Sequence, residues 1–250
     1  ASDVYKRQIQ GMSLPILLFP AALIAVIADL IVPELTEAQV QGRLRGLGYM
    51  LERLYRLGLF FSMAVAGACF FFAHPLGELI YSEPAAGQYI RLLAPLVPIM
   101  YMDTLVDGML KGVGEYRANM RYNIIDAATG LLLVWLLLPR YGVAGYLFSI
   151  SATELLNFAL SAARLTRVTV FRLQPLCWLL TAAAAVGGWW LLRLIFGRLL
   201  SRTGQPLILL LLVFLYLACY GAALLLCGAL RREELSWLFS LLRGEKSPKT

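Results

Sequence analysis

The sequence contains few charged residues. Only 15% of its 250 residues are Asp, Glu, Lys or Arg, against roughly 25% in a typical soluble domain, while 60% are hydrophobic. A soluble fold of this size cannot hide so much apolar surface, and disordered chains have low hydrophobicity. The composition therefore excludes both classes and predicts an integral membrane protein.

Residues typical of catalysis are also scarce. The sequence has one histidine and four cysteines, and the cysteines lie inside apolar runs without paired spacing, which is typical of buried thiols. It has no metal-type His/Cys cluster, phosphate-binding glycine loop or nucleophile elbow. An enzyme is therefore the least expected class, and we expect no cofactor.

Seven apolar segments dominate what is present. Most are long enough to cross about 30 Å of hydrocarbon as helices, and they are continuous rather than alternating, which excludes an outer-membrane barrel. The sequence predicts an all-α, polytopic bundle of seven transmembrane helices at Ile9–Val32, Leu57–Ala73, Tyr89–Leu110, Asn123–Leu138, Val143–Ala163, Pro175–Phe196 and Pro206–Leu230.

The net charge of the chain is +7, and its arginines lie between the apolar segments. This distribution favours a charge difference between the two sides of a membrane over nucleic-acid binding. Basic residues concentrate in the stretches 43–56, 111–121 and 164–172 and in the C-terminal tail, whereas the opposite loops carry few. The positive-inside rule therefore places the 34–56 segment and the carboxyl terminus in the cytoplasm of a multi-pass protein of the cytoplasmic (inner) membrane.

Two of the basic stretches are amphipathic. Leucines recur at three- and four-residue steps in Glu37–Tyr55 and again in the tail at Glu234–Arg243. Each pattern fits a helix lying in the membrane interface or an extension of the neighbouring span. Both alternatives remain open at this point.

Several motifs resemble the polysaccharide-exporter branch of the multidrug/oligosaccharidyl-lipid/polysaccharide (MOP) flippase superfamily, especially the stage V sporulation protein B group, relatives of the MurJ-type lipid II flippase. The motifs keep the order found in that group: Gly11–Pro20, Leu30–Ala38, Leu93–Pro98, Asp107–Gly112 and Met120–Asp126.

The resemblance implies helices 8 to 14 of a fourteen-helix transporter, with the N-terminal lobe of the same protein as a missing partner. Residues 1–8 would be a lead-in or scar, 9–170 the C-terminal lobe of a MATE/MOP-type fold, 171–230 two additional helices, and 231–250 a cytoplasmic amphipathic tail. The expected function is flipping or exporting a lipid-linked oligosaccharide or polysaccharide precursor by alternating access. A drug/cation antiporter of the same superfamily and a non-transporting membrane scaffold are the alternatives.

Ionisable residues inside the predicted spans are the candidates for function, since each costs about 2.5–3.5 kcal/mol on insertion scales. Asp103, Asp107 and Lys111 follow one another at four-residue steps and so share a helix face. They predict either an interfacial salt bridge or one wall of a substrate cavity. Arg91 joins this set as a cation for a phosphate, the alternative being an arginine that snorkels to the interface.

A second set favours cation coupling. Asn123, Asp126, Thr153 and Glu154 lie on two consecutive predicted spans, and their oxygens suit Na+, while a carboxylate could instead carry H+. MurJ-type relatives build a sodium site from helices that correspond to these two, which supports a site at Asp126 and Glu154. Ordinary helix–helix hydrogen bonding is the alternative.

Prolines interrupt two of the predicted spans. Pro15 and Pro20 lie in the first and Pro95 and Pro98 in the third, where each removes a backbone hydrogen bond and bends the helix. Broken helices commonly line the substrate path of transporters, although a static kink is equally compatible with the pattern.

Overall fold

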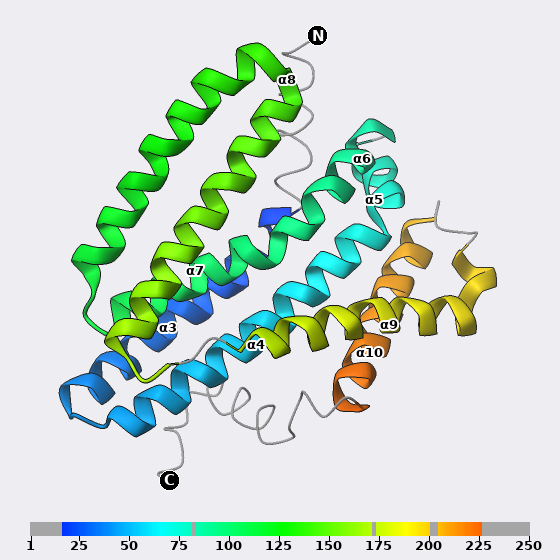
Figure 1. Cartoon of the computed structure of the whole chain (residues 1–250). Helices are drawn as coiled ribbons and strands as arrows, with labels where there is room; N and C mark the ends of the chain where they lie inside the picture. Colours follow the sequence, from blue (N-terminus) through cyan, green and yellow to red (C-terminus); the bar gives the residue numbers. More distant parts are fainter. Residues whose placement is uncertain (1–16, 82–83, 172–173, 201–204, 227–250) are drawn as a thin grey trace.

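The computed structural model describes residues 17–81, 84–171, 174–200 and 205–226, and in these ranges every regular element is helical (Figure 1). The elements are α3 (Ala21–Val40), α4 (Leu44–Phe71), α5 (Ala73–Tyr81), α6 (Pro84–Leu93), the 3-10 turn η2 (Ala94–Leu96), α7 (Val97–Gly112), α8 (Tyr116–Val168), α9 (Pro175–Leu200) and α10 (Pro206–Leu226). The predicted all-α membrane bundle is confirmed.

Five of the described helical stretches are long and apolar enough to cross a membrane: Leu44–Phe71, Ala86–Gly112, Tyr116–Val168, Pro175–Gly197 and Pro206–Leu226. This number is smaller than the seven predicted spans for two reasons. The predicted spans 123–138 and 143–163 are both parts of α8. The first predicted span begins outside the described residues, and α3 continues eight residues beyond the predicted end at Val32. This extension adds Glu34 and Glu37 to the Asp29 that the predicted span already contains.

Helix α8 is a hairpin with two arms. Gly142 has φ 56° and ψ −129°, which interrupts the helical backbone and reverses the chain, so that the first arm precedes Gly142 and the second arm follows it. Gly145 lies against the main chain at Leu137, where the absence of a side chain lets the arms approach closely. Figure 1 shows the two green arms running side by side.

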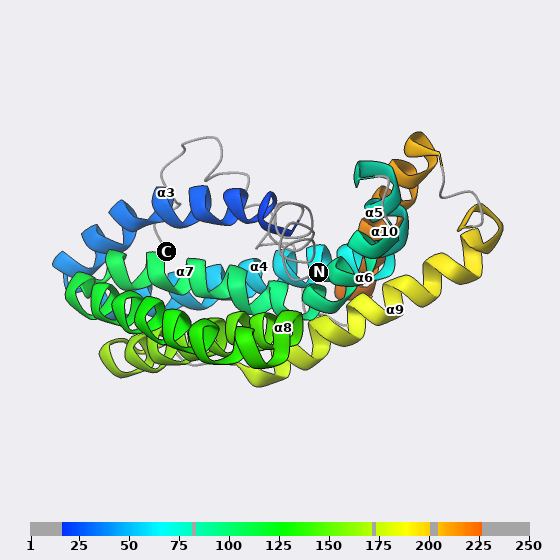
Figure 2. The same cartoon turned by 90° about the horizontal axis from the view of Figure 1, so that it is seen from above.

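The centre of the bundle is α7. It packs against α3 on one side and α8 on the other, with α4 alongside, and Figure 2 shows this order of layers. The buried core of this part includes Leu35 of α3, Leu51 of α4 and Leu105 of α7. Burial of such apolar side chains, about 1.5–3 kcal/mol for each fully buried leucine, stabilises the packing.

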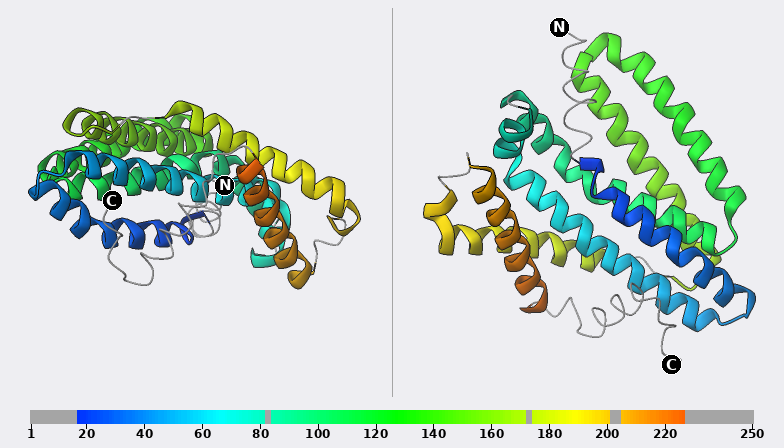
Figure 3. Two further views of the ribbon diagram at one scale, coloured as in Figure 1. Left: turned by 90° about the horizontal axis from the view of Figure 1, so that it is seen from below. Right: turned by 180° about the vertical axis from the view of Figure 1, so that it is seen from behind.

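The last two helices pack against the far half of α4, as the view from behind in Figure 3 shows. Aromatic rings fill this contact. The Phe71 and Trp189 rings are parallel with centroids 4.5 Å apart, and the Tyr220 hydroxyl donates to the Phe60 carbonyl at 3.0 Å. The pair α9–α10 is thereby joined to the rest of the bundle through α4.

Both tight turns between helices at one end of the bundle contain a glycine with positive φ. Gly42 (φ 68°) follows α3, and Gly114 (φ 80°) follows α7. In each turn the next residue donates its N–H to a carbonyl five residues earlier, Arg43 to Ala38 and Glu115 to Leu110, which is the Schellman arrangement. The left-handed conformation that this turn needs is readily available only to glycine.

The basic stretches lie at this same end. The Thr36 hydroxyl of α3 donates to the Gly112 carbonyl of α7 at 3.0 Å, and Arg164 pairs with Glu115 at 2.9 Å. A Cβ on Gly48 would lie 3.7 Å from that of Val170. The predicted grouping of these stretches on one face therefore agrees with the contacts, and the face opposite contains the Gly142 turn.

The amphipathic segment Glu37–Tyr55 does not form a helix of its own. Its first residues end α3, and from Leu44 onward it is the beginning of α4, which continues without a break to Phe71. Leu47, Leu51 and Leu54 are buried in the core of the bundle. The alternative of an extended span is therefore confirmed here, and the predicted interfacial helix is wrong. The tail at 234–243 lies outside the described residues.

The proline breaks occur where two of the four prolines predict them. Pro95 lies in η2 and Pro98 near the start of α7, so the predicted span Tyr89–Leu110 consists of α6, a 3-10 turn and α7. Pro20 is the N-cap residue of α3 and follows a short turn, whereas Pro15 lies outside the described residues.

Candidate functional site

Polar side chains from α7 and both arms of α8 meet where these three helical segments pack together, from the buried Asn157 to the exposed Asn123. They form three pairs, each with four-residue spacing, so that both members of a pair lie on one helix face. We call this set the polar cluster: Asp103 and Asp107 of α7, Asn119 and Asn123 of the first arm, and Asn157 and Ser161 of the second arm.

Asp107 receives hydrogen bonds from both arms of α8. The Asn123 amide donates to Asp107 Oδ2 at 3.0 Å, and the Ser161 hydroxyl donates to Oδ1 at 3.0 Å. With its Nδ2 turned toward Asp107, the Asn119 amide also donates, at 2.9 Å to Oδ1 and 3.0 Å to Oδ2. These bonds hold the carboxyl group of Asp107 in one position between the arms.

Asp103 accepts fewer hydrogen bonds than Asp107. The Asn157 amide donates to Asp103 Oδ2 at 2.9 Å, but Asp103 Oδ1 and Asn157 Oδ1 are both buried without a hydrogen-bond partner in the part of the chain that the structure describes. Asn157 itself is only 4% exposed. A buried acceptor without a donor costs about 1–3 kcal/mol, so these two oxygens are suited to a proton or a cation.

The second arm of α8 carries these groups on a stripe of small and polar residues. Its buried positions recur every four residues: Gly145, Ser149, Thr153, Asn157 and Ser161. A Cβ on Gly130 of the first arm would lie 3.5 Å from Thr153 Cγ2, so the stripe also packs against the first arm. Small residues at such contacts let membrane helices approach closely.

The predicted cation-coupling residues are divided by this geometry. Asn123 bonds to Asp107 rather than to Asp126, and the Thr153 hydroxyl donates to the Ser149 and Ile150 carbonyls of its own helix at 3.1 and 3.0 Å. Asp126 and Glu154 come from opposite arms of α8, and Asp126 Oδ1 is buried without a partner among the described residues.

The four carboxyl groups of Asp103, Asp107, Asp126 and Glu154 interact electrostatically. Such a concentration of acids between membrane helices is costly and is typical of ion or proton pathways. Within the described ranges, however, no three His, Cys, Asp or Glu side chains have the arrangement of a metal centre. A cation here would therefore need amide, hydroxyl or water oxygens in addition to carboxylates.

Neither of the two predicted cationic side chains, Lys111 and Arg91, pairs with these acids. Lys111 is one turn beyond Asp107 on α7, but no ion pair within 4.0 Å joins these two described residues. Asp107 bonds to α8 instead. Arg91 belongs to the last turn of α6, on the other side of the η2 break, and its guanidinium lies over the Phe70 ring at 5.0 Å.

Sequence reasoning missed three members of the cluster, Asn119, Asn157 and Ser161. The prediction included only the amide and hydroxyl nearest to an acid in sequence, Asn123 and Thr153. Asn157 and Ser161 lie inside the predicted span Val143–Ala163, with the same four-residue spacing as Asp103 and Asp107. Pairs of polar residues with the same four-residue spacing on neighbouring predicted spans are the sequence pattern that could have predicted this cluster.

Part of the chain is similar to known proteins. The MatE family model matches residues 40–136, which include α4 to α7 and most of the first arm of α8. Stage V sporulation protein B of Bacillus subtilis (strain 168) is 26% identical over 163 residues, which cover 64% of this chain and 32% of that protein. Over these residues the chain is similar to the MatE family and to stage V sporulation protein B.

The chain matches about a third of the length of this curated relative. The region matched by the family model contains both acids of α7 and the amides of the first arm, whereas Asn157 and Ser161 follow it. The polar cluster therefore joins residues inside the matched region to residues of the second arm.

Proposed function

We propose that this chain is the C-terminal lobe, with two additional helices, of a transporter that moves a lipid-linked oligosaccharide or polysaccharide precursor across the cytoplasmic membrane by alternating access. The MatE match and the similarity to stage V sporulation protein B support a membrane transporter. The observation that carries the proposal is the polar cluster, because acids held between membrane helices are seldom retained without a function.

The polar cluster would serve as the coupling site. Asp103 Oδ1 and Asn157 Oδ1 lack donors, and Asp126 Oδ1 lacks one as well, so binding of Na+ or H+ near them would remove the cost of buried unpaired oxygens. Because these groups come from α7 and both arms of α8, a bound cation would change how strongly the three helices hold one another. Such a differential contact is what a ligand needs to shift a conformational equilibrium.

The broken span next to the cluster fits this mechanism. The break at η2 separates α6 from α7, so α7 can tilt against α8 with little change to α6. Discontinuous helices of this kind commonly flank the binding site of secondary transporters. Substrate would pass along α7 and would be enclosed by the other lobe of the same protein.

The test is a flipping assay with the full-length protein in vesicles. Transport of a fluorescent lipid-linked oligosaccharide would be compared for the unchanged protein, Asp103→Asn, Asp107→Asn and the control Asp29→Asn, with imposed Na+ or pH gradients. Asp29 is an exposed carboxylate of α3 outside the polar cluster, so its replacement controls for the loss of one charge.

We expect gradient-driven flipping that falls at least tenfold in the two cluster variants and not in the control. Flipping that ignores both gradients would contradict the coupling role. Transport of cationic dyes in place of the saccharide would identify a drug antiporter, and the absence of any transport by the folded protein would favour a scaffold. Either of the last two results would overturn the proposed function.

A further inference from the structure

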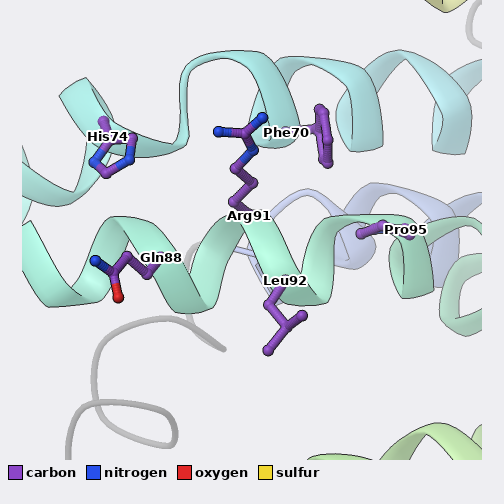
Figure 4. A pocket seen from close by; sticks show the side chains of 6 residues that line it. All are labelled: Phe70, His74, Gln88, Arg91, Leu92 and Pro95. Atoms are coloured by element: carbon purple, nitrogen blue, oxygen red, sulfur yellow. The ribbon is translucent and has the colours of Figure 1, made fainter.

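A cavity of about 400 Å³ lies near the start of the broken helix, away from the polar cluster. It is lined by Phe70 of α4, His74 of α5, Gln88, Arg91 and Leu92 of α6, and Pro95 of η2. Figure 4 shows the Arg91 side chain extending from α6 toward the segment that carries Phe70 and His74. No acid is among the lining residues.

The polar groups of this cavity are all able to donate hydrogen bonds. The Arg91 guanidinium has five N–H groups in a planar fork, the Gln88 amide has two, and the imidazole of His74 has at least one in any protonation state. Arg91 lies over the Phe70 ring at 5.0 Å, which fixes the guanidinium without using its N–H groups. In the described part of the chain no carboxylate pairs with it.

Backbone packing holds the two sides of the cavity together. A Cβ on Gly77 of α5 would lie 2.5 Å from the Gly87 nitrogen of α6, and one on Gly87 would lie 2.9 Å from the Ala73 carbonyl oxygen. The two helices are therefore in direct main-chain contact, which brings His74 opposite Gln88 and Arg91. The cavity is built by these two glycines rather than by flexible side chains.

Its depth in the bilayer follows from helix length. The stretch Ala86–Gly112 has 27 residues, which at about 1.5 Å per residue exceeds the roughly 30 Å of hydrocarbon by about 10 Å. Arg91 lies five residues from the start of this stretch. With the excess shared between both ends, its Cα lies near the edge of the hydrocarbon, from which a long arginine side chain reaches the lipid phosphates. Leu92, 61% exposed, continues the cavity wall toward the hydrocarbon.

We propose that this cavity binds the phosphoryl group of an anionic membrane lipid, with the Arg91 guanidinium as the principal contact and Gln88 and His74 as further donors. Arginine binds phosphate oxygens through two parallel hydrogen bonds, which lysine cannot do. The apolar side of the cavity, Phe70 and Leu92, would lie along the first part of the acyl chain. This binding is independent of the proposed transport, since it requires neither a saccharide nor a cation gradient.

The test measures lipid binding to the full chain in detergent by native mass spectrometry. Short-chain phosphatidylglycerol, phosphatidylcholine and inorganic phosphate would be added separately, and phosphate also in competition with phosphatidylglycerol. The variants are Arg91→Gln, Arg91→Lys and the control Arg193→Gln, which removes an exposed arginine of α9 outside the cavity. A thermal unfolding curve for each variant establishes that it is folded.

We expect phosphatidylglycerol to bind more tightly than phosphatidylcholine, and Arg91→Gln to weaken it about tenfold, the effect of losing a charged hydrogen-bond partner. Arg91→Lys should retain only part of the affinity for phosphatidylglycerol, and Arg193→Gln should bind it as tightly as the unchanged protein. Competition by inorganic phosphate would show that the phosphoryl group alone is recognised, and its absence that the lipid is needed as well; both support the proposal. Equal binding by the unchanged protein and Arg91→Gln would overturn it, as would an equal loss in Arg193→Gln.

Discussion

The Asn157 amide donates to Asp103 Oδ2 at 2.9 Å and so joins two helices whose residues are 54 positions apart in the sequence. The bond exists because α8 reverses at Gly142, which returns the second arm to α7. With the bonds to Asp107, it makes the α7–α8 contact polar at its centre, in a bundle that is otherwise held by apolar packing.

Removing the Asn157 amide should destabilise the protein. Asn157→Ala leaves Asp103 Oδ2 without the amide that donates to it, and an unpaired buried group costs about 1–3 kcal/mol, so we expect a loss of that size. Chemical unfolding in detergent micelles measures it. A double-mutant cycle with Asp103→Ala, which removes the acceptor, should give a coupling energy of about 0.6 kcal/mol, the average found between membrane helices.

The matched control for this variant is Ser151→Ala in the same arm. The Ser151 hydroxyl donates only to the Leu147 carbonyl of its own helix at 2.9 Å, so its loss should change stability by less than about 0.5 kcal/mol. An equal effect of the two substitutions would show that the hydrogen bond from Asn157 to Asp103 does not stabilise the contact between α7 and α8.

At Gly108 the main chain of α7 lies close to Ala28 of α3. A Cβ there would lie 2.7 Å from that of Ala28, so Gly108→Ala must push α3 away. We expect a net destabilisation of about 1–3 kcal/mol, the usual cost of overpacking. Thermal unfolding in micelles is the measurement.

Gly187 in α9 provides the comparison for Gly108. Nothing lies within 4 Å of a Cβ placed there, so Gly187→Ala should be neutral or stabilise by up to about 1 kcal/mol through helix propensity. If both alanine variants were neutral, the close α3–α7 contact would be absent from the protein in solution.

The ion pair between Arg164 and Glu115 closes the open end of the α8 hairpin. The guanidinium contacts both carboxylate oxygens, at 2.9 to 3.1 Å, but the side chains are 37% and 25% exposed. Solvent screening limits such a pair, and we expect Glu115→Gln to cost about 0.5–1 kcal/mol. Repeating the unfolding experiment at 1 M salt should reduce this difference, and a difference that grows with salt would contradict an electrostatic contribution.

Sequence patterns predicted the helices well because apolar length and proline position act locally. The reversal between the spans ending at Leu138 and starting at Val143 occurs at Gly142, and the break at Pro95 is present. The helix α5 was not predicted. Its nine residues are too few for a span. It also packs on α6 through the main-chain contact between Gly77 and Gly87, and a contact between two helices cannot be predicted from a local sequence pattern.

The candidate site was only partly predictable, for a physical reason. The four-residue spacing of Asp107 and Lys111 favoured a salt bridge on one helix, but the oxygens of Asp107 bond to Asn123 and Ser161 of α8 instead. Which of two partners a carboxylate takes depends on tertiary packing. A partner four residues away on the same helix can be read from the sequence, whereas a partner on another helix depends on the fold.

The most direct test of the central claim, that α8 is a membrane hairpin carrying the polar cluster into the bilayer, is cysteine accessibility at its two ends. In a variant whose native cysteines are replaced, Arg117→Cys near the open end and Tyr141→Cys beside the Gly142 turn would be labelled by a membrane-impermeant maleimide in oriented vesicles. Both positions are exposed. We expect labelling of position 117 only from the cytoplasmic side and of position 141 only from the outside. Labelling of both from one side, with the protein folded, would contradict the hairpin across the membrane and the transport site built on it.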